Sequence, residues 1–354
     1  MRNQMRKRIT SEEIAMTIRY KHYFFLLFFL PVLLSCNRNR LKVDTSDIDA
    51  EVEVVRFDRE LFSISSEDTL EYLKELRNDY PGFFDLYTYK VIHAGGIQDD
   101  FFPGVMREFL TDTMIRNVKV RVEEVFRNFE EAEKDLIQAF KCYRYHFPEK
   151  ELPTIFTVIS GFNQSVFTAE EIVGISLDKY LGRDAKYYRQ LSNVPLYKIK
   201  NMHPGKVVPD IVYAWGLTEF DATEATTTLL DHMVHQGKLL YFTDALLPEE
   251  PDTLKIGYTD EELQWCHNNE PQMWNYLIEK KLLYSNNRMD IVRYTNDGPT
   301  TTGFPRESPG KTGTWLGWQI VRQYMKKHPE VTLAELMGNS DYHGILNESG
   351  YYTK

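Results

Sequence analysis

Apolar residues at intervals of three and four predict amphipathic helices along much of the chain. One set is Leu70, Leu73 and Leu76, and a longer helical region extends from Asp112 to Pro148. Further helices are expected over residues 223–242, 270–283 and 314–327. The last of these carries a stripe of aromatic residues, which we expect to lie in the core.

Three segments instead carry the branched and aromatic residues that favour strands. They are residues 52–57, 154–160 and 172–177, and the last two are expected to be neighbours in a small sheet. The chain after residue 205 is expected to be mainly helical. We therefore predict an α+β fold, predominantly helical, forming one globular domain over residues 53–354, with the small sheet packed against the helix that carries Asp231 to His235. A helical N-terminal subdomain over residues 53–150 is an option within this domain.

The N-terminus has the three-part layout of a secretion signal. An apolar stretch from Tyr23 to Leu34 ends in Leu33-Leu34-Ser35-Cys36, which has the form of a lipobox. About 20 apolar residues are needed to span a bilayer, and this stretch has only twelve. We therefore predict a lipoprotein signal peptide over residues 1–35 and a lipid on Cys36. The alternative is a short uncleaved anchor with an unmodified cysteine.

The residues after the cysteine predict a flexible tether over residues 36–52. Arg38 and Arg40 stand where acidic export tags occur in some bacteria. The body is therefore expected to face the periplasm from the inner or outer membrane. The chain can start at Met1 or at Met16, and initiation at Met16 would give a compact signal of ordinary form.

The net charge of the chain limits the classes of partner that it can bind. The whole chain carries a net charge of −10, and removing residues 1–35 leaves 36 basic against 50 acidic side chains, a net charge of −14. This balance argues against nucleic acid as a partner, because nucleic acid requires a basic face.

Beyond Cys36 the only cysteines are Cys142 and Cys266, with no CxxC pair. Either a single disulfide or two buried free thiols is consistent with this content.

Candidate chemistry is concentrated in Asp231-His232-Met233-Val234-His235, inside a predicted helix. Residues i and i+4 share a helix face, and two histidines at this spacing bind zinc in HExxH metallopeptidases. Here Asp231 stands at the first ligand position and His232 at that of the glutamate base. Asp231, His235 and Glu270 could together bind zinc. Without the glutamate, however, the base for a metal-bound water is missing.

Several readings of these residues remain open. The helix motif could form an active hydrolase or a structural metal site, or it could consist of ordinary helix residues, which is the favoured interpretation. If a relict cleft persists, His232, Tyr241, Trp274 and Tyr276 are candidates to line it. The segment Glu307-Ser308-Pro309-Gly310-Lys311-Thr312-Gly313 superficially suggests a phosphate loop. Its proline and the lack of a preceding strand favour a helix-entry turn.

Six segments, spread in order over the predicted domain, carry a family resemblance. They are Arg56-Phe57-Asp58, Ile159 to Asn163, Leu177 to Gly182, Gly237 to Pro248, Trp265 to Glu270, and Glu307 to Val321. They resemble the gliding motility-associated lipoprotein B (GldB) family of Bacteroidetes. The resemblance implies a lipid-anchored envelope protein with a zincin-like fold, related to zinc-dependent peptidases. In gliding species the family is tied to surface motility and its linked protein export.

Because this chain departs from HExxH at Asp231 and His232, we expect a pseudo-metallopeptidase without a cofactor. The predicted function is that of a non-catalytic lipoprotein of the cell envelope, bound to the membrane through the lipid on Cys36. It would bind other envelope proteins of a gliding motility or protein-export assembly. The main alternative is a divergent zinc-dependent metallopeptidase using Asp231, His235 and Glu270. A third option is a carrier or sensor of a small ligand.

Overall fold

The computed structural model describes residues 41–63, 69–191 and 194–351, so the predicted signal peptide and Cys36 lie outside the described residues. Residues 43–354 form one compact unit, and the helices and strands belong to it. No helix among the described residues has both the length and the apolar character that a bilayer crossing requires.

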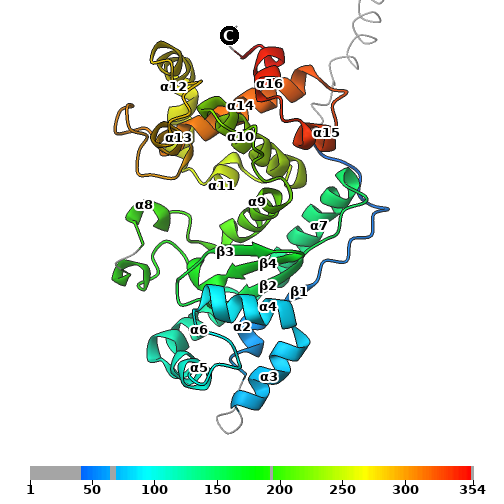
Figure 1. The fold of residues 1–354 in the computed structure, drawn as a ribbon, viewed down its shortest axis with the longest axis vertical. Coiled ribbons are helices and arrows are strands. Elements are labelled where there is room, and N and C mark those ends of the chain that lie inside the picture. The colour runs from blue at the N-terminus through cyan, green and yellow to red at the C-terminus, as the bar shows by residue number, and fades with distance from the viewer. Residues whose placement is uncertain (1–40, 64–68, 192–193, 352–354) are drawn as a thin grey trace, which may run out of the picture. The chain divides into compact units, whose positions relative to one another are not determined.

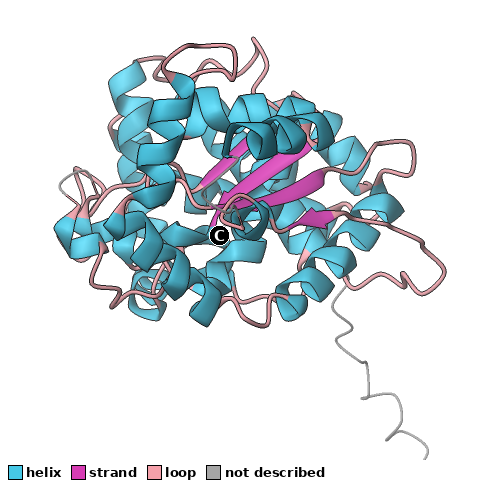
Figure 2. Ribbon diagram, turned by 90° about the horizontal axis from the view of Figure 1, so that it is seen from below, coloured by secondary structure: helices cyan, strands magenta, loops and turns pink. Residues whose placement is uncertain are grey.

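A mixed sheet lies at the centre of this unit (Figures 1 and 2). Among the described residues its strands are β1 (Val54–Val55), β2 (Thr154–Val158), β3 (Val166–Ala169) and β4 (Ile172–Ser176), in the order β1-β2-β4-β3. The pairs β1–β2 and β2–β4 are parallel, whereas β3 pairs antiparallel with β4. Strands β2 and β4 are buried along nearly their whole length, as expected for strands covered on both faces.

Short helices from the first part of the chain cover one face of the sheet (Figure 1). Their aromatic side chains pack against β2, where the rings of Phe83 and Phe156 stack with centroids 3.7 Å apart. Phe57 meets Phe83 edge to face, and Tyr87 donates a hydrogen bond of 2.7 Å to the carbonyl of Ile159. The elements of this layer are α2 (Phe57–Glu60), α3 (Thr69–Asp79), α4 (Pro81–Leu86), the π-helical turn η2 (Tyr87–Val91), α5 (Phe102–Thr111) and α6 (Thr113–Val125).

On the other face, helix α9 (Val207–Glu219) packs on β3 and β4. Its apolar residues lie on all sides, which is typical of a helix buried between layers. Helix α10 (Leu229–Leu246) packs on α9 in turn, and makes its largest contact with α14 (Thr312–Lys327). The expectation that the helix carrying Asp231 to His235 covers the sheet is therefore wrong, because α9 occupies that position.

The remaining helices surround α10. Helix α7 (Glu130–His146) contacts α9 and α10, and α13, α15 and α16 also pack on α10. The bounds of the other elements are α8 (Leu196–Ile199), α11 (Asp252–Ile256), α12 (Asp260–Glu279), α13 (Arg288–Thr295), α15 (Leu333–Gly338) and α16 (Tyr342–Ser349), with 3₁₀ turns η3 (Leu177–Lys179), η4 (Tyr188–Gln190) and η5 (Pro204–Lys206).

Much of the predicted secondary structure is present, and the predicted α+β class with mainly helical content is confirmed. The differences have local causes. The long helical region after Asp112 is split into α6 and α7 by the segment from Phe126 to Phe129. Helix α10 begins at Leu229 rather than residue 223, because Thr228 caps it. Helix α12 begins at Asp260 after the cap Thr259, ten residues before the predicted start.

Two further findings concern the predicted tether and the cysteines. The predicted flexible tether includes residues that pack on the body: Thr45, Ala50 and Val52 are buried. The Gln138 amide of α7 donates a hydrogen bond of 3.0 Å to the hydroxyl of Thr45, and Figure 1 shows this segment running beside α7. Of the two alternatives for the cysteines, buried free thiols are confirmed for Cys142 and Cys266.

Candidate functional site

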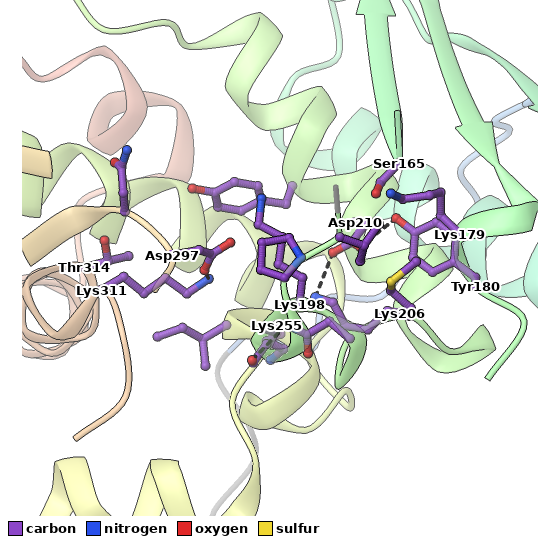
Figure 3. A pocket seen from close by; sticks show the side chains of 18 of the residues that line it. Ser165, Lys179, Tyr180, Lys198, Lys206, Asp210, Lys255, Asp297, Lys311 and Thr314 are labelled. Carbon is purple, nitrogen blue, oxygen red and sulfur yellow. Dashed lines mark hydrogen bonds and ion pairs between the residues drawn. The ribbon is translucent and has the colours of Figure 1, made fainter. Parts of the chain in front are cut away.

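A polar cavity of about 670 Å³ opens at the edge of the sheet where β2 and β4 end. Loops that follow neighbouring parallel strands meet at such an edge, which is where ligands commonly bind in sheets of this kind. Figure 3 shows Lys179 and Tyr180 on one side of the cavity and Asp297 and Lys311 on the other. Residues of α8, α9, α10, α11 and α14 complete its walls.

A buried carboxylate shapes the loop that follows β2. Asp178 is fully buried and accepts hydrogen bonds from the backbone N–H of Ser160 at 3.2 Å and of Phe162 at 2.6 Å. These bonds hold Gly161 and Phe162 at φ values of 67° and 65°, in the left-handed region that a bulky residue rarely adopts. Burial raises the pKa of Asp178 to about 6, although the two N–H donors lower it. Strained backbone of this kind is common at functional sites.

Positive charge dominates the cavity. Its lining includes five lysines and two aspartates, a local balance of +3 in a chain whose net charge is −10. The five lysines are Lys179, Lys198, Lys206, Lys255 and Lys311. They come from separate elements between the end of β4 and the start of α14, so only the fold brings them together.

Three of the lysines are paired with carboxylates. Lys206 lies 2.7 Å from Asp210, whose other oxygen accepts a hydrogen bond of 2.8 Å from the Tyr180 hydroxyl (Figure 3). Lys311 lies 2.8 Å from Asp297. Burial acts to raise the pKa of Asp297, but the charge and hydrogen bond of Lys311 together with the positive charges of Lys198 and Lys200 outweigh it, and the pKa falls below its usual value.

The third pair belongs to a buried charge network behind the cavity. Lys255 lies 2.9 Å from Asp244, and both side chains are almost completely buried. Asp244 also accepts hydrogen bonds from the guanidinium of Arg322 at 2.7 and 2.8 Å and from the Trp318 indole at 2.9 Å. This network fixes α10, α11 and α14 around one carboxylate. The predicted core role of the aromatic stripe on α14 is confirmed, since Trp315 and Trp318 are fully buried.

The helix motif that the sequence singled out lies elsewhere on α10. Asp231 is the third residue of that helix and forms a capping box with Thr228. Its carboxylate accepts hydrogen bonds from the backbone N–H of Thr227 at 3.1 Å and of Thr228 at 2.8 Å. The Nε2 atom of His343 lies 3.5 Å from its other oxygen. The carboxylate that would replace a zinc ligand is thus engaged in starting the helix.

The other residues of the predicted zinc site also have different partners. His235 is buried, with Nδ1 3.5 Å from the Tyr342 hydroxyl, and burial lowers its pKa to about 4. Glu270 on α12 accepts a hydrogen bond of 2.6 Å from the Tyr351 hydroxyl. Among the described residues no group of three His, Cys, Asp or Glu side chains could hold a metal ion. Asp231, His235 and Glu270 are therefore not gathered as ligands, and these residues do not fit zinc.

The aromatic and histidine residues proposed for a relict cleft do not line the cavity. The cavity walls contain none of these four residues, which are His232, Tyr241, Trp274 and Tyr276. Helix α10 presents Gln236 and Leu240 there instead, and the side-chain amide oxygen of Gln236 accepts a hydrogen bond of 2.7 Å from the Thr314 hydroxyl. Trp274 packs edge to face on Tyr351, and the ring of Tyr276 packs at a tilt on Phe304. Sequence reasoning missed the lysines because no short motif contains more than one of them.

The segment from Glu307 to Gly313, which superficially suggested a phosphate loop, is a helix-entry turn, as predicted. Helix α14 begins at Thr312, directly after Lys311, whose φ is 48°. The Thr301 hydroxyl fixes this turn by donating a hydrogen bond of 2.7 Å to the Pro309 carbonyl. The turn does not form a phosphate loop, but it places the Lys311 ammonium in the cavity wall.

A comparison with protein families identifies the chain. The family model described as gliding motility protein GldB matches residues 38–353, nearly all of the compact unit. The chain belongs to the GldB family. No curated protein and no solved structure gives a significant match.

Membership of the GldB family supports a lipoprotein associated with gliding motility and with the cell envelope. The segments by which the sequence resembles the family meet in part at the cavity. Asn163 follows β2, Lys179 and Tyr180 follow β4, and Lys311 precedes α14, and each belongs to one of these segments. Part of the cavity wall is thus formed by segments that carry the family resemblance.

Proposed function

We propose that this GldB-family protein is a non-catalytic lipoprotein of the cell envelope, tethered through a lipid on Cys36 and facing the periplasm. It serves a gliding motility and protein-export assembly by binding other envelope proteins. The observation that carries this proposal is the family match over residues 38–353, with the lipobox directly upstream.

The absence of catalysis is supported by the helix motif. His232 stands where a zinc peptidase needs its glutamate base, and the Asp231 carboxylate accepts backbone N–H groups at the start of α10. The imidazole of His235 lies in a buried setting that disfavours its charged form. Purified protein is therefore expected to cleave no peptide library with or without zinc. One equivalent of bound zinc, lost in His235→Ala together with peptide cleavage, would contradict this expectation.

Partner binding is supported by exposed apolar side chains near the end of α12 and on α13. Met289 and Val292 are one helical turn apart on α13 and are 66% and 39% exposed, and Tyr284 in the preceding loop is 62% exposed. Side chains of this kind favour contact with other proteins when they gather on a surface. A charged residue at Met289 is expected to weaken such a contact.

Crosslinking in intact cells followed by co-purification tests the proposal. Wild-type protein is expected to be recovered with envelope proteins. Met289→Glu should reduce this recovery, whereas Val120→Glu, at a similarly exposed apolar position on α6, should not. Recovery of the protein always alone would count decisively against a role in an assembly.

Lipid attachment has a separate test. Metabolic labelling with a palmitate analogue is expected to mark the wild-type protein and not Cys36→Ala. Equal labelling of both proteins would refute the anchor while leaving the partner experiment interpretable.

A further inference from the structure

Two of the cavity's lysines differ from the other three in their partners. Lys179 and Lys198 form no ion pair with a carboxylate among the described residues, whereas Lys206, Lys255 and Lys311 each have one. The Lys179 ammonium donates only a hydrogen bond of 3.2 Å to the Phe162 carbonyl. Two ammonium groups of the cavity lining thus have no carboxylate in direct contact among the described residues.

The two lysines are close enough to influence each other. Burial lowers the pKa of Lys179, the Asp178 carboxylate opposes this effect, and the positive charge of Lys198 lowers the pKa further. Figure 3 shows both side chains among the residues that line the cavity, Lys179 from the end of β4 and Lys198 from α8. Neighbouring like charges destabilise one another unless an anion lies between them. The arrangement therefore favours the binding of a negatively charged group.

The rest of the lining suits a small polar ligand. A volume of about 670 Å³ lies within the range of small-molecule sites. Asn163 and Ser165 offer neutral hydrogen-bonding groups beside Lys179, and Asn201 does so after α8. Because the chain as a whole is acidic, its general field repels anions, and the positive charge here is a local feature.

We propose that this cavity binds a small anionic ligand, and that Lys179 and Lys198 bind its phosphate or carboxylate group. Lys206, Lys255 and Lys311 are paired with carboxylates and add little net charge, so the anionic end of the ligand lies toward Lys179 and Lys198. Met289, Val292 and Tyr284, on which the partner contact was proposed, do not line the cavity, so the two proposals are tested independently.

Isothermal titration calorimetry on the full-length chain in detergent tests this proposal. The probes are inorganic pyrophosphate and citrate, which represent the phosphate and carboxylate classes, with glucose as a neutral control at constant ionic strength. We expect one of the two anions, or both, to bind at one per chain. The double variant Lys179→Gln with Lys198→Gln should weaken binding at least tenfold, because charge-assisted hydrogen bonds are lost. The matched control is Lys326→Gln with Lys327→Gln, exposed positions at the far end of α14.

The outcomes separate cleanly. Binding of pyrophosphate alone identifies a phosphate ligand, and binding of citrate alone identifies a carboxylate ligand. Because Lys179 is partly buried, Lys198→Glu provides a second variant at an exposed position, and it should abolish binding without altering thermal unfolding. Failure of both anions to bind would overturn the proposal. Equal affinity in wild type and Lys198→Glu, or equal weakening in the control, would also overturn it.

Discussion

Helices α10 and α14 approach each other closely at a pair of glycines, and adding one methyl group there should separate the helices. At Gly317 of α14 a Cβ atom would lie 1.8 Å from the carbonyl oxygen of Met233 on α10. At Gly237 of α10 it would lie 2.3 Å from the carbonyl carbon of Gly317. Such Cβ contacts are essentially never shorter than 3.0 Å. Gly317→Ala must therefore open the interface locally by 1.2 Å (3.0 − 1.8).

The cost follows from what faces the methyl group. The neighbour is backbone, which cannot rotate away as a side chain would, so the helices must move apart. Inserting a methyl group into a packed interior costs about 1–3 kcal/mol and sometimes more. A gap of about 1 Å also loses a quarter to a half of each dispersion contact across it. Alanine returns about 1 kcal/mol through helix propensity. We expect Gly317→Ala to lower the free energy of unfolding by about 2–4 kcal/mol.

Urea unfolding followed by circular dichroism and tryptophan fluorescence measures this change. The control is Gly104→Ala on α5, where a Cβ would have no neighbour within 4 Å. That variant should be stabilised by about 0.5–1 kcal/mol, since only the propensity term remains. The reasoning would be refuted if Gly317→Ala were as stable as wild type, or if both variants shifted equally.

Three further predictions concern buried polar groups. Asp244→Ala should lower the free energy of unfolding in urea by about 3–5 kcal/mol, because it leaves buried cations unpaired. The control Glu71→Ala, which removes an exposed pair with Lys74, should change it by less than about 0.5 kcal/mol. Similar losses in the two variants would contradict this prediction. Burial lowers the pKa of His235 from 6.5 to about 4. Between pH 6.5 and about pH 4 the unfolded chain therefore binds a proton that the folded chain does not. The free energy of unfolding should fall by up to about 3 kcal/mol as the pH drops through this range. His235→Gln should flatten this part of the stability profile, and an unchanged profile would count against it. In Cys36→Ala protein, Cys142 and Cys266 should not react with a thiol reagent until urea unfolds the chain, because both are buried; rapid reaction of native protein would disprove it.

The sequence predicts the elements whose pattern is strong and local. Helix 314–327 and strand β2 are found within a few residues of their predicted bounds, because their apolar positions repeat with one period. Strand β3 was missed, since Val166–Ala169 is short and its pairing with β4 depends on the turn at Glu170 and Glu171. The start of α10 depends on which threonine caps the helix. Thr228 does so, although the threonines just before it have the same side chain and could cap it equally well.

The arrangement of the helices and the cavity could not be predicted in this way. The motif at Asp231 drew attention to α10 as the partner of the sheet, yet α9, which is apolar over most of its length, is the helix that packs there. The lysines of the cavity are separated by many residues and share no spacing. Their proximity results from the parallel pairing of β2 with β4 and from the packing of α14 on α10. Long-range contacts of this kind leave no trace in a local pattern.

The capping role of Asp231 has a consequence for attempts to engineer a peptidase from this scaffold. Substituting histidine for Asp231 and glutamate for His232 would restore the HExxH sequence but would remove the carboxylate from the first turn of α10. Two amide hydrogens would lose their acceptor, at a cost of about 1 kcal/mol. A designer would first have to supply a new acceptor for that turn and bring a third ligand near it.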